Sequence, residues 1–282
     1  MRQGWPQYVA NTVAAAALAL SASVLPTNAQ VGADLNISPK RVVFAPGERS
    51  AIVYVFNQGD QPATYTVDLV DRIMLPDGQI IAASERPELD ISSAADLVQH
   101  TPRRVTLQPR ESQAIRLRAR PAGDGSAEHR SHLTITALPP EDSGFTAAQA
   151  AAGNDGDVAL QVIALFSVSI PVIVRDNAAD ARAGISNAHL EQGASGTELV
   201  FDIDRLGANS VYGDLEVRLG TTDDAPLMTV VRGVAVYPEI AKRTVRLALP
   251  QAVSTGQALT VVYRDDDAHP GEVLAVTRVA TP

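Results

Sequence analysis

The residue types that could do chemistry are few in this chain of 282 residues, and none stands at a spacing typical of catalysis. The sequence has no cysteine and five histidines. It contains no GxSxG nucleophile elbow, no HExxH zinc motif and no glycine-rich phosphate loop of the GxxxxGK[ST] or GxGxxG type. We therefore expect no enzymatic activity, no catalytic residue and no cofactor.

Two of the histidines, His129 and His132, lie close together in the stretch EHRSH. Because successive side chains on a strand point to opposite faces, a spacing of three residues separates the two rings. The sequence predicts that they share no metal ion, and we expect hydrogen-bonded positions on the surface instead.

Three consecutive acids, Asp265 to Asp267, raise the question of calcium. An EF-hand loop requires glycine five residues after its first acid, where this chain has Pro270. We expect a solvated hairpin turn there and no metal site.

Arg116, Arg118 and Arg120 alternate with apolar residues, so they form a row on one face of a predicted strand. Such a row can bind phosphate or carboxylate. A solvated outer face is the more frequent arrangement, and we assign no site to it.

The stretch VALQVIALFSVSIPVIVR, residues 158–175, is the element around which the chain is organised. Every even-numbered position from Val158 to Val174 is apolar, a period of two that predicts a strand about three times the usual length. No Asp, Glu or Lys interrupts that face, so one domain of ordinary size could hardly cover it. Two interpretations remain, a core strand that joins two domains and an exposed strand that docks a partner. Ser167, Ser169 and Pro171 argue against a membrane span.

Further strand-like runs, separated by Gly and Pro turns, occupy most of the remaining sequence. They cover residues 41–44, 51–56, 64–74, 105–107, 112–120, 130–138, 198–206, 214–219, 228–236, 244–249, 258–264 and 273–279, with a weak strand near Ile80. No helical period is convincing after residue 29, so we predict an all-β fold with an antiparallel sandwich in each half. Residues 141–157 are acidic and rich in Ala and Gly, which predicts a mobile loop.

Length and composition define the domains and exclude one class of partner. A chain of 282 residues favours two domains, and a formal charge of −9 argues against nucleic acid. An apolar run from Val13 to Leu25, followed by Thr27–Ala29, predicts a secretory signal peptide, with a membrane anchor as the alternative. We expect a signal peptide at residues 1–29 and domains at residues 30–176 and 177–282, with no membrane insertion after signal cleavage.

Several segments together carry a family resemblance. They are ISPKRVVF, VYVFNQGDQPATYTV, LQPRESQAIRLR, EHRSHLTITALPP, the long alternating strand, LEVRL and VYPEIAKRTVRLALP. In this order they resemble the PapD-like periplasmic chaperones of chaperone–usher pilus assembly. In EHRSHLTITALPP the matching residues are Glu128, Arg130, Ile135, Leu138 and Pro139-Pro140, whereas His129, His132 and Thr134 depart from the pattern.

The resemblance implies two Ig-like antiparallel β-sandwich domains set at an angle around a cleft. It implies a location in the periplasm, no enzymatic activity, and two partners, an incomplete pilus or fimbrial subunit and an outer-membrane usher. In such families the last strand of the first domain fills the groove left by the subunit's missing strand, a case of β-augmentation. The donated residues here would be Leu160, Val162, Ala164, Phe166 and Val168.

The resemblance also implies an anchor for the subunit's C-terminal carboxylate. Known members hold it with an Arg of the first strand and a Lys of the donor strand, and the aligned positions here are Pro39 and Pro171. Since charge-assisted capture of a carboxylate needs a cation, Lys40, Arg41 and Arg175 are the nearest candidates. The alternative function is a two-domain Ig-like extracytoplasmic structural or adhesin-type protein. It explains the sandwiches and the signal, but not an acidic segment that leads into an apolar strand.

Overall fold

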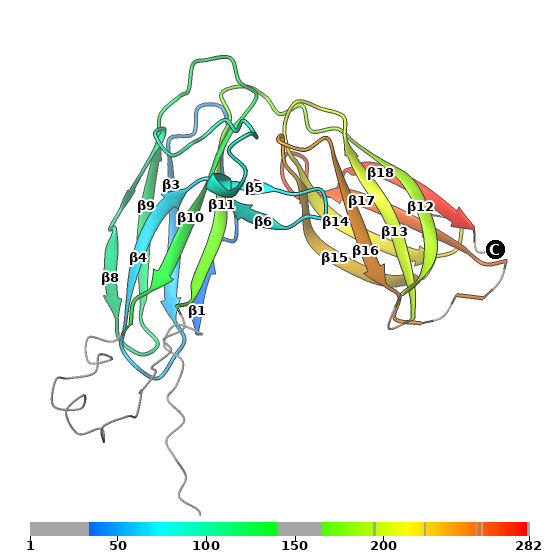
Figure 1. Ribbon diagram of the computed structural model, residues 1–282, viewed down its shortest axis with the longest axis horizontal. Coiled ribbons are helices and arrows are strands. Elements are labelled where there is room, and N and C mark those ends of the chain that lie inside the picture. The colour runs from blue at the N-terminus through cyan, green and yellow to red at the C-terminus, as the bar shows by residue number, and fades with distance from the viewer. Residues whose placement is uncertain are drawn as a thin grey trace, which may run out of the picture. The chain divides into compact units, whose positions relative to one another are not determined.

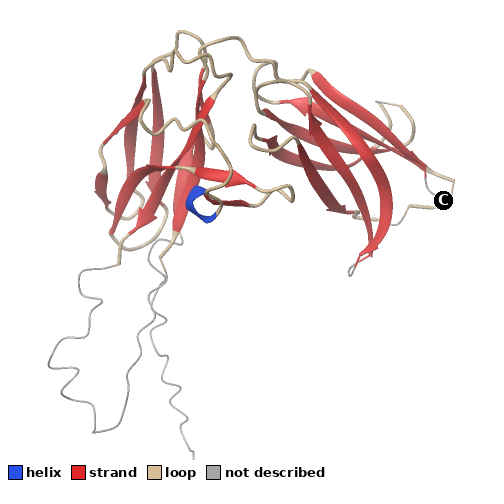
Figure 2. Ribbon diagram, turned by 45° about the horizontal axis from the view of Figure 1, so that its top comes forward, coloured by secondary structure: helices blue, strands red, loops and turns tan. Residues whose placement is uncertain are grey.

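The computed structural model describes residues 34–139, 165–193, 196–222, 224–251, 253–254 and 256–280. All of them belong to one compact unit, Val31–Pro282. Apart from one 3-10 turn, η1 (Ala83–Glu85), the regular structure in these ranges consists of strands (Figures 1 and 2). The predicted all-β fold is confirmed.

The first group of strands forms two facing sheets and a short hairpin. One sheet has the order β1-β3-β9-β7 and the other β2-β11-β10-β4-β8, while β5 pairs with β6. The bounds are β1 Leu35–Ser38, β2 Val42–Phe44, β3 Ser50–Asn57, β4 Ala63–Val70, β5 Arg72–Met74, β6 Ile80–Ala82, β7 Val98–Thr101, β8 Arg104–Leu107, β9 Ser112–Ala119, β10 His129–Ala137 and β11 Ser167–Val174.

The second group forms another sandwich. Its sheets have the orders β12-β13-β16 and β15-β14-β17-β18. The bounds are β12 Ala183–Gly193, β13 Gly196–Arg205, β14 Val211–Leu219, β15 Leu227–Val236, β16 Lys242–Ala248, β17 Ala258–Asp265 and β18 Val273–Ala280. Among the described strands every pairing is antiparallel except that of β11 with β2.

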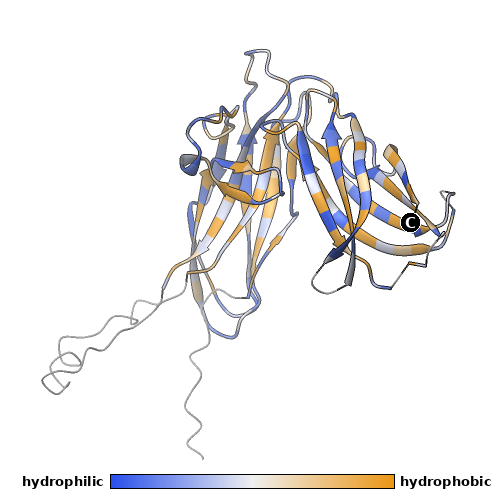
Figure 3. Ribbon diagram, turned by 45° about the vertical axis from the view of Figure 1, so that its right-hand side comes forward, coloured by the Kyte–Doolittle hydropathy of each residue, from blue (hydrophilic) through white to orange (hydrophobic). Residues whose placement is uncertain are grey.

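Alternation along the strands explains both cores. In β3, Val53 and Val55 are fully buried whereas Ile52 and Tyr54 are exposed, and Figure 3 shows the same alternation of apolar and polar residues along other strands. Each sandwich has a cluster of buried apolar side chains. The cluster of the second sandwich also takes in Met74 of β5 and Ile173 of β11. The domain boundaries at residues 29 and 176 stay predictions.

Several element predictions need correction. The strand expected at residues 158–175 begins at Ser167, while residues 158–164 and the loop at 141–157 lie outside the described ranges. The single run 64–74 divides into β4 and β5 at Asp71, whose carboxylate accepts hydrogen bonds from Ser131 Oγ (2.5 Å) and Ser93 Oγ (2.9 Å). Three strands, β1, β7 and β12, were not predicted, because their sequences are short or largely polar.

Candidate functional site

One side of β11 is unpaired over half its length. Strand β10 pairs with β11 from Ser167 to Val174, whereas β2 pairs with its other side only from Val172 to Val174. Within the described residues no strand pairs with that second side from Ser167 to Pro171. We call this segment the open edge. An unpaired edge of this kind is a template for a strand from another chain.

The peptide groups of the open edge have a defined direction. Ala137 N–H donates to Phe166 C=O at 2.9 Å, so this pair is hydrogen-bonded. Because bonded and non-bonded pairs alternate in an antiparallel ladder, even-numbered residues of β11 direct their peptide groups toward β10. Odd-numbered residues direct theirs outward, as Arg175 N–H does to Phe44 C=O at 3.0 Å. Pro171 is one of them, so its missing N–H removes no bond to β10.

Most described apolar side chains of β11 pack within the protein's own core. Ile170, Val172 and Val174 are buried in the first sandwich, and Val168 packs against the same cluster. This part of the strand agrees with the core-strand interpretation. Phe166 is half-buried at the end of the described segment.

The structure therefore places two of the five predicted donor residues, Phe166 and Val168. The other three, Leu160, Val162 and Ala164, lie outside the described residues. The donor-strand assignment stays a prediction.

Two of the three predicted anchor residues converge on one carboxylate. Arg41 Nη2 and Arg175 Nη2 lie 3.0 Å and 2.8 Å from Asp267 Oδ2. The same Nη2 atoms lie close to Ser210 Oγ, at 3.5 Å for Arg41 and 3.2 Å for Arg175. Lys40 is exposed, and its Nζ donates to Asn36 Oδ1 at 2.5 Å. The sequence did not indicate that Arg41 and Arg175 already have an acidic partner.

Arg175 and its partners form a buried ion network. Arg175 Nε donates to Glu128 Oε2 at 3.1 Å, and the two side chains are 4% and 1% exposed. Burial works against the charged form of Asp267, but the charges of Arg41 and Arg175 outweigh it and lower the pKa of that carboxyl. Burial likewise opposes the charge of Arg175, and Glu128 and Asp267 still raise the pKa of its guanidinium. Asp267 and Arg175 therefore both remain charged.

A group of basic side chains, which shares Arg41 with the contacts of Asp267, lies at the end of the open edge. Arg41 directly precedes β2 and stands at the level of Pro171, which pairs with His132 of β10. Arg130 Nη1 lies 3.5 Å from both ring nitrogens of His132. We call Arg41, Arg72, Arg130 and His132 the cationic site.

Aromatic rings from the second sandwich cover this site. The guanidinium of Arg130 lies 3.8 Å from the centre of the Tyr237 ring, and that of Arg41 lies 4.5 Å from the centre of the Tyr212 ring. Stacking on a ring stabilises a cation but accepts no N–H in the ring plane. The rings therefore accept none of the guanidinium N–H groups, which depend on other partners, such as Asp267 for Arg41 and Glu239 for Arg130.

The cationic site contains buried donors without an acceptor. Nε and Nη1 of Arg41 have no hydrogen-bond partner, and neither have Nε of Arg72 and Nε of Arg130. A buried donor that is left unpaired costs about 1–3 kcal/mol, and more when it is charged. An anionic acceptor would therefore fit this site.

The charge state of His132 follows from its neighbours. Burial, together with the charges of Arg130, Arg72 and Arg41, lowers the pKa of this imidazole to about 3. The ring is therefore neutral near pH 7, and the positive charge of the site lies on its arginines.

Three surface predictions meet different outcomes. Arg116, Arg118 and Arg120 are exposed, as expected. His129 and His132 were expected on the surface, and this is wrong, since both are buried under the loops and rings that pack on β10. His129 Nδ1 and Nε2 lie 3.2 Å from Ser93 O and 3.1 Å from Asp124 Oδ1, so it has no partner in common with His132.

The prediction at Asp265–Asp267 is right about the hairpin turn, which joins β17 to β18, but wrong about its solvation. Asp265 is buried and accepts the N–H groups of Asp267 (3.0 Å) and His269 (2.5 Å). This bonding directs Asp267 toward the two arginines. Within the described ranges no group of three or more His, Asp or Glu side chains could hold a metal ion.

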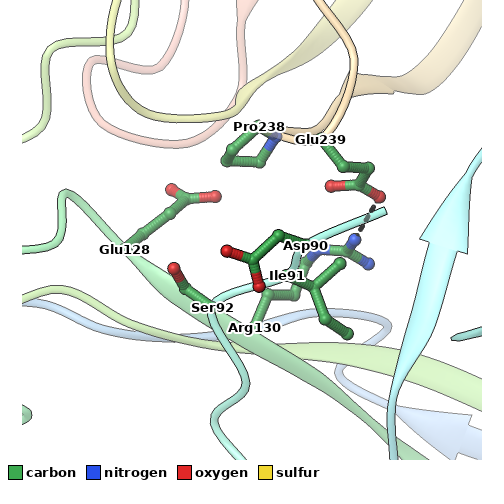
Figure 4. A pocket seen from close by; sticks show the side chains of 7 residues that line it. All are labelled: Asp90, Ile91, Ser92, Glu128, Arg130, Pro238 and Glu239. Atoms are coloured by element: carbon green, nitrogen blue, oxygen red, sulfur yellow. Dashed lines mark hydrogen bonds and ion pairs between the residues drawn. The ribbon is translucent and has the colours of Figure 1, made fainter. Parts of the chain in front are cut away.

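A cavity of about 210 Å³ adjoins the ion network (Figure 4). Its lining consists of Asp90, Ile91, Ser92, Glu128, Arg130, Pro238 and Glu239. Arg130 pairs with Glu239 on one side of it, and Glu128 Oε1 is buried without a partner. The cavity is polar and offers both a donor and acceptors.

Comparison with known proteins gives likeness at the level of structure. No family model matches the sequence, and no curated protein matches it. The chain is similar in structure to chaperones of pilus assembly. The CupB2 chaperone of Pseudomonas aeruginosa is 15% identical, with 88% of this chain and 100% of that chain covered, and a TM-score of 0.45.

Two further solved structures give similar values. The Escherichia coli chaperone DraB is 14% identical over 88% of this chain and 96% of that chain, with a TM-score of 0.42. A chain of the CsuC–CsuE complex of chaperone and tip subunit from Acinetobacter baumannii is 12% identical. The match covers 88% of this chain and 99% of that chain, with a TM-score of 0.43. Likeness at this level assigns no partner or site to this chain. In the described part of the chain, no helix has the length and apolar character needed to cross a membrane.

Proposed function

We propose that this protein is a periplasmic chaperone that holds an incomplete pilus or fimbrial subunit by strand addition to β11. The observation that carries the proposal is the open edge, which ends at the cationic site. The protein acts as a carrier and not as an enzyme. It passes the bound subunit to an outer-membrane usher.

The cationic site selects the direction of the added strand. A strand on the open edge lies in line with β2, because β2 pairs with the same side of β11. If the added strand runs parallel to β11, its carboxyl end arrives at Arg41. An antiparallel strand would instead bring an N-terminal ammonium group to a cluster of guanidinium groups, which is electrostatically unfavourable. The charge therefore favours a parallel strand with a free carboxylate.

Arg41 suits the role of anchor better than the other two candidates. Its Nη2 is held by Asp267, whereas Nε and Nη1 are buried without a partner. Arg175 is engaged by Glu128, Ser210 and Asp267, and Lys40 is exposed. An incoming carboxylate would give Arg41 the acceptor that its neighbours do not provide, in a charge-assisted hydrogen bond.

The apolar face of β11 supplies the second part of the interaction. Its alternation runs from the buried Ile170 through the partly buried Val168 to the half-buried Phe166. Toward the N-terminus the same alternation passes through Ala164, Val162 and Leu160. Those that do not pack in the protein's own core would enter the subunit's groove, each large one contributing roughly 1.5–3 kcal/mol by burial.

Binding of a strand peptide tests the proposal. The probe is a synthetic peptide with the C-terminal strand sequence of a pilus subunit encoded beside an usher gene, as the free acid and as the amide. We expect the free acid to bind at least tenfold more tightly, and Arg41→Gln to remove this difference. Lys40→Gln is the matched control and should preserve it. Equal binding of acid and amide by the parent protein would contradict the anchor.

A further inference from the structure

His132 is a buried side chain whose hydrogen bonding is incomplete. It is 3% exposed, and Arg130 Nη1, at 3.5 Å, is its hydrogen-bonding neighbour among the described residues. The plane of the Tyr237 ring is nearly perpendicular to the imidazole, with the ring centres 6.3 Å apart. At that separation the ring packs near the imidazole without supplying a hydrogen-bond acceptor.

The contact between His132 and Arg130 leaves one imidazole N–H without a hydrogen-bond acceptor. A neutral imidazole has one N–H donor and one acceptor nitrogen, whereas a guanidinium group only donates. Arg130 can therefore serve the acceptor nitrogen of His132 and cannot accept its N–H. Within the described ranges no other group accepts that hydrogen. A buried donor in this state requires an acceptor from outside.

The register places this donor beside the predicted end of the added strand. His132 pairs with Pro171, and Arg41 stands at the same level on the other side of Pro171. Neighbouring strands are about 4.8 Å apart, so the two backbones are roughly 10 Å apart with proline between them. Proline contributes no side-chain donor. Both flanking side chains belong to the same face of the sheet, since residues in one cross-strand row point the same way.

We propose that His132 is a second binding residue for the carboxylate of the added strand, to which its N–H donates from the side opposite Arg41. The proposal rests on the proposed function and deepens it. It also assigns a role to a residue at which the sequence departs from the family pattern. Arg41 supplies charge, and neutral His132 supplies a directed donor.

The groups that face His132 agree with this role. Arg130 lies beside it on β10, Arg72 and Arg41 act on it electrostatically, and the Tyr237 ring packs nearly perpendicular to it. These charges and its burial keep the ring neutral, with a pKa of about 3. A bound carboxylate would offset part of the positive charge. The imidazole therefore does not need to be protonated for binding.

The test compares two substitutions with the same acid and amide peptides. His132→Phe keeps a ring against Tyr237 and removes the N–H, whereas His132→Asn keeps a short donor. We expect His132→Phe to weaken the free acid about tenfold and to leave the amide unchanged. His132→Asn should restore part of the difference. Arg116→Gln, on the exposed arginine row, is the matched control and should change neither affinity.

A spectroscopic measurement on the parent protein tests the inference even if His132→Phe does not fold. In the parent protein the side-chain nitrogen-15 signals of His132 should shift on addition of the acid peptide and not of the amide. An equal loss for acid and amide in His132→Phe, or no shift in the parent protein, would overturn the inference. If Arg41→Gln removes the preference for the acid while His132→Phe does not, the inference fails and the proposed function stands. If neither residue affects that preference, the inference and the Arg41 anchor both fail.

Discussion

Arg175 Nη2 lies 2.8 Å from Asp267 Oδ2, although 92 positions separate the two residues. Arg175 directly follows β11, and Asp267 lies in the hairpin between β17 and β18. Their ion pair therefore ties the end of the central strand to the second sandwich. Both side chains are buried, so removing either charge would leave the other buried without its partner, which is energetically costly.

Arg175→Met should destabilise the protein by about 3–5 kcal/mol, because it leaves Glu128 and Asp267 as buried charges with fewer partners. Thermal and denaturant unfolding measure this. Arg182→Met is the matched control, because Arg182 pairs with Asp180 at the exposed surface, where solvent screening leaves an ion pair with little effect on stability. Similar losses in the two variants would show that the buried pair is not a structural tie.

Two substitutions on the same face of β11 should separate folding from binding. Ile170 is 2% exposed, so Ile170→Ala should lower stability by about 2–5 kcal/mol. Phe166 is half-buried at the end of the described strand segment, so Phe166→Asp should affect folding less. It should reduce subunit binding by orders of magnitude, because it places a charge in the subunit's groove. Unfolding curves and a subunit pull-down measure the two effects. Unfolding of the first sandwich by Phe166→Asp would favour the core-strand interpretation for this position.

His132 should make stability depend on pH between about 6.5 and 3. Its pKa falls from 6.5 to about 3 in the folded protein. In that interval the unfolded chain binds a proton that the folded chain does not, so this contribution is complete above pH 6.5 and is lost as the pH falls. The slope is up to about 1.4 kcal/mol per pH unit.

His132→Phe removes this contribution, so its stability should fall less steeply than that of the parent protein over the same interval. His189→Gln is the control, because the His189 side chain is exposed. Urea unfolding at several pH values gives the comparison. Parallel curves for the parent protein and His132→Phe would mean that His132 titrates normally.

The sequence predicts elements well where burial alternates. The runs that became β3, β9 and β14 show a period of two in which buried and more exposed residues alternate, and the structure places them within a few residues of the expected bounds. β12 has the sequence AGISNAHLEQG, in which polar residues dominate. Its pairing with β13 and its contact with β18 of the facing sheet stabilise it as a strand, and no local sequence pattern indicates either.

The candidate site is less accessible to sequence reasoning. Arg41 and Arg175 were chosen for their charge, but Asp267 belongs to a run of acids that is typical of a solvated turn. The contact of the two arginines with Asp267 depends on how the two sandwiches pack, and the alternation within single strands gives no information about that packing. The same holds for His132, whose burial depends on Tyr237 from the second sandwich.

Amide hydrogen exchange at the open edge tests the central claim most directly. In the unbound protein the N–H groups of Ser167 and Ser169 point away from β10, so they should exchange much faster than those of Val168 and Ile170. Addition of a subunit, or of its C-terminal strand as the free acid, should slow Ser167 and Ser169 and leave Val168 and Ile170 as they were. If Ser167 and Ser169 are protected without a partner, or exchange at the same rate when one is bound, no strand is added to this edge.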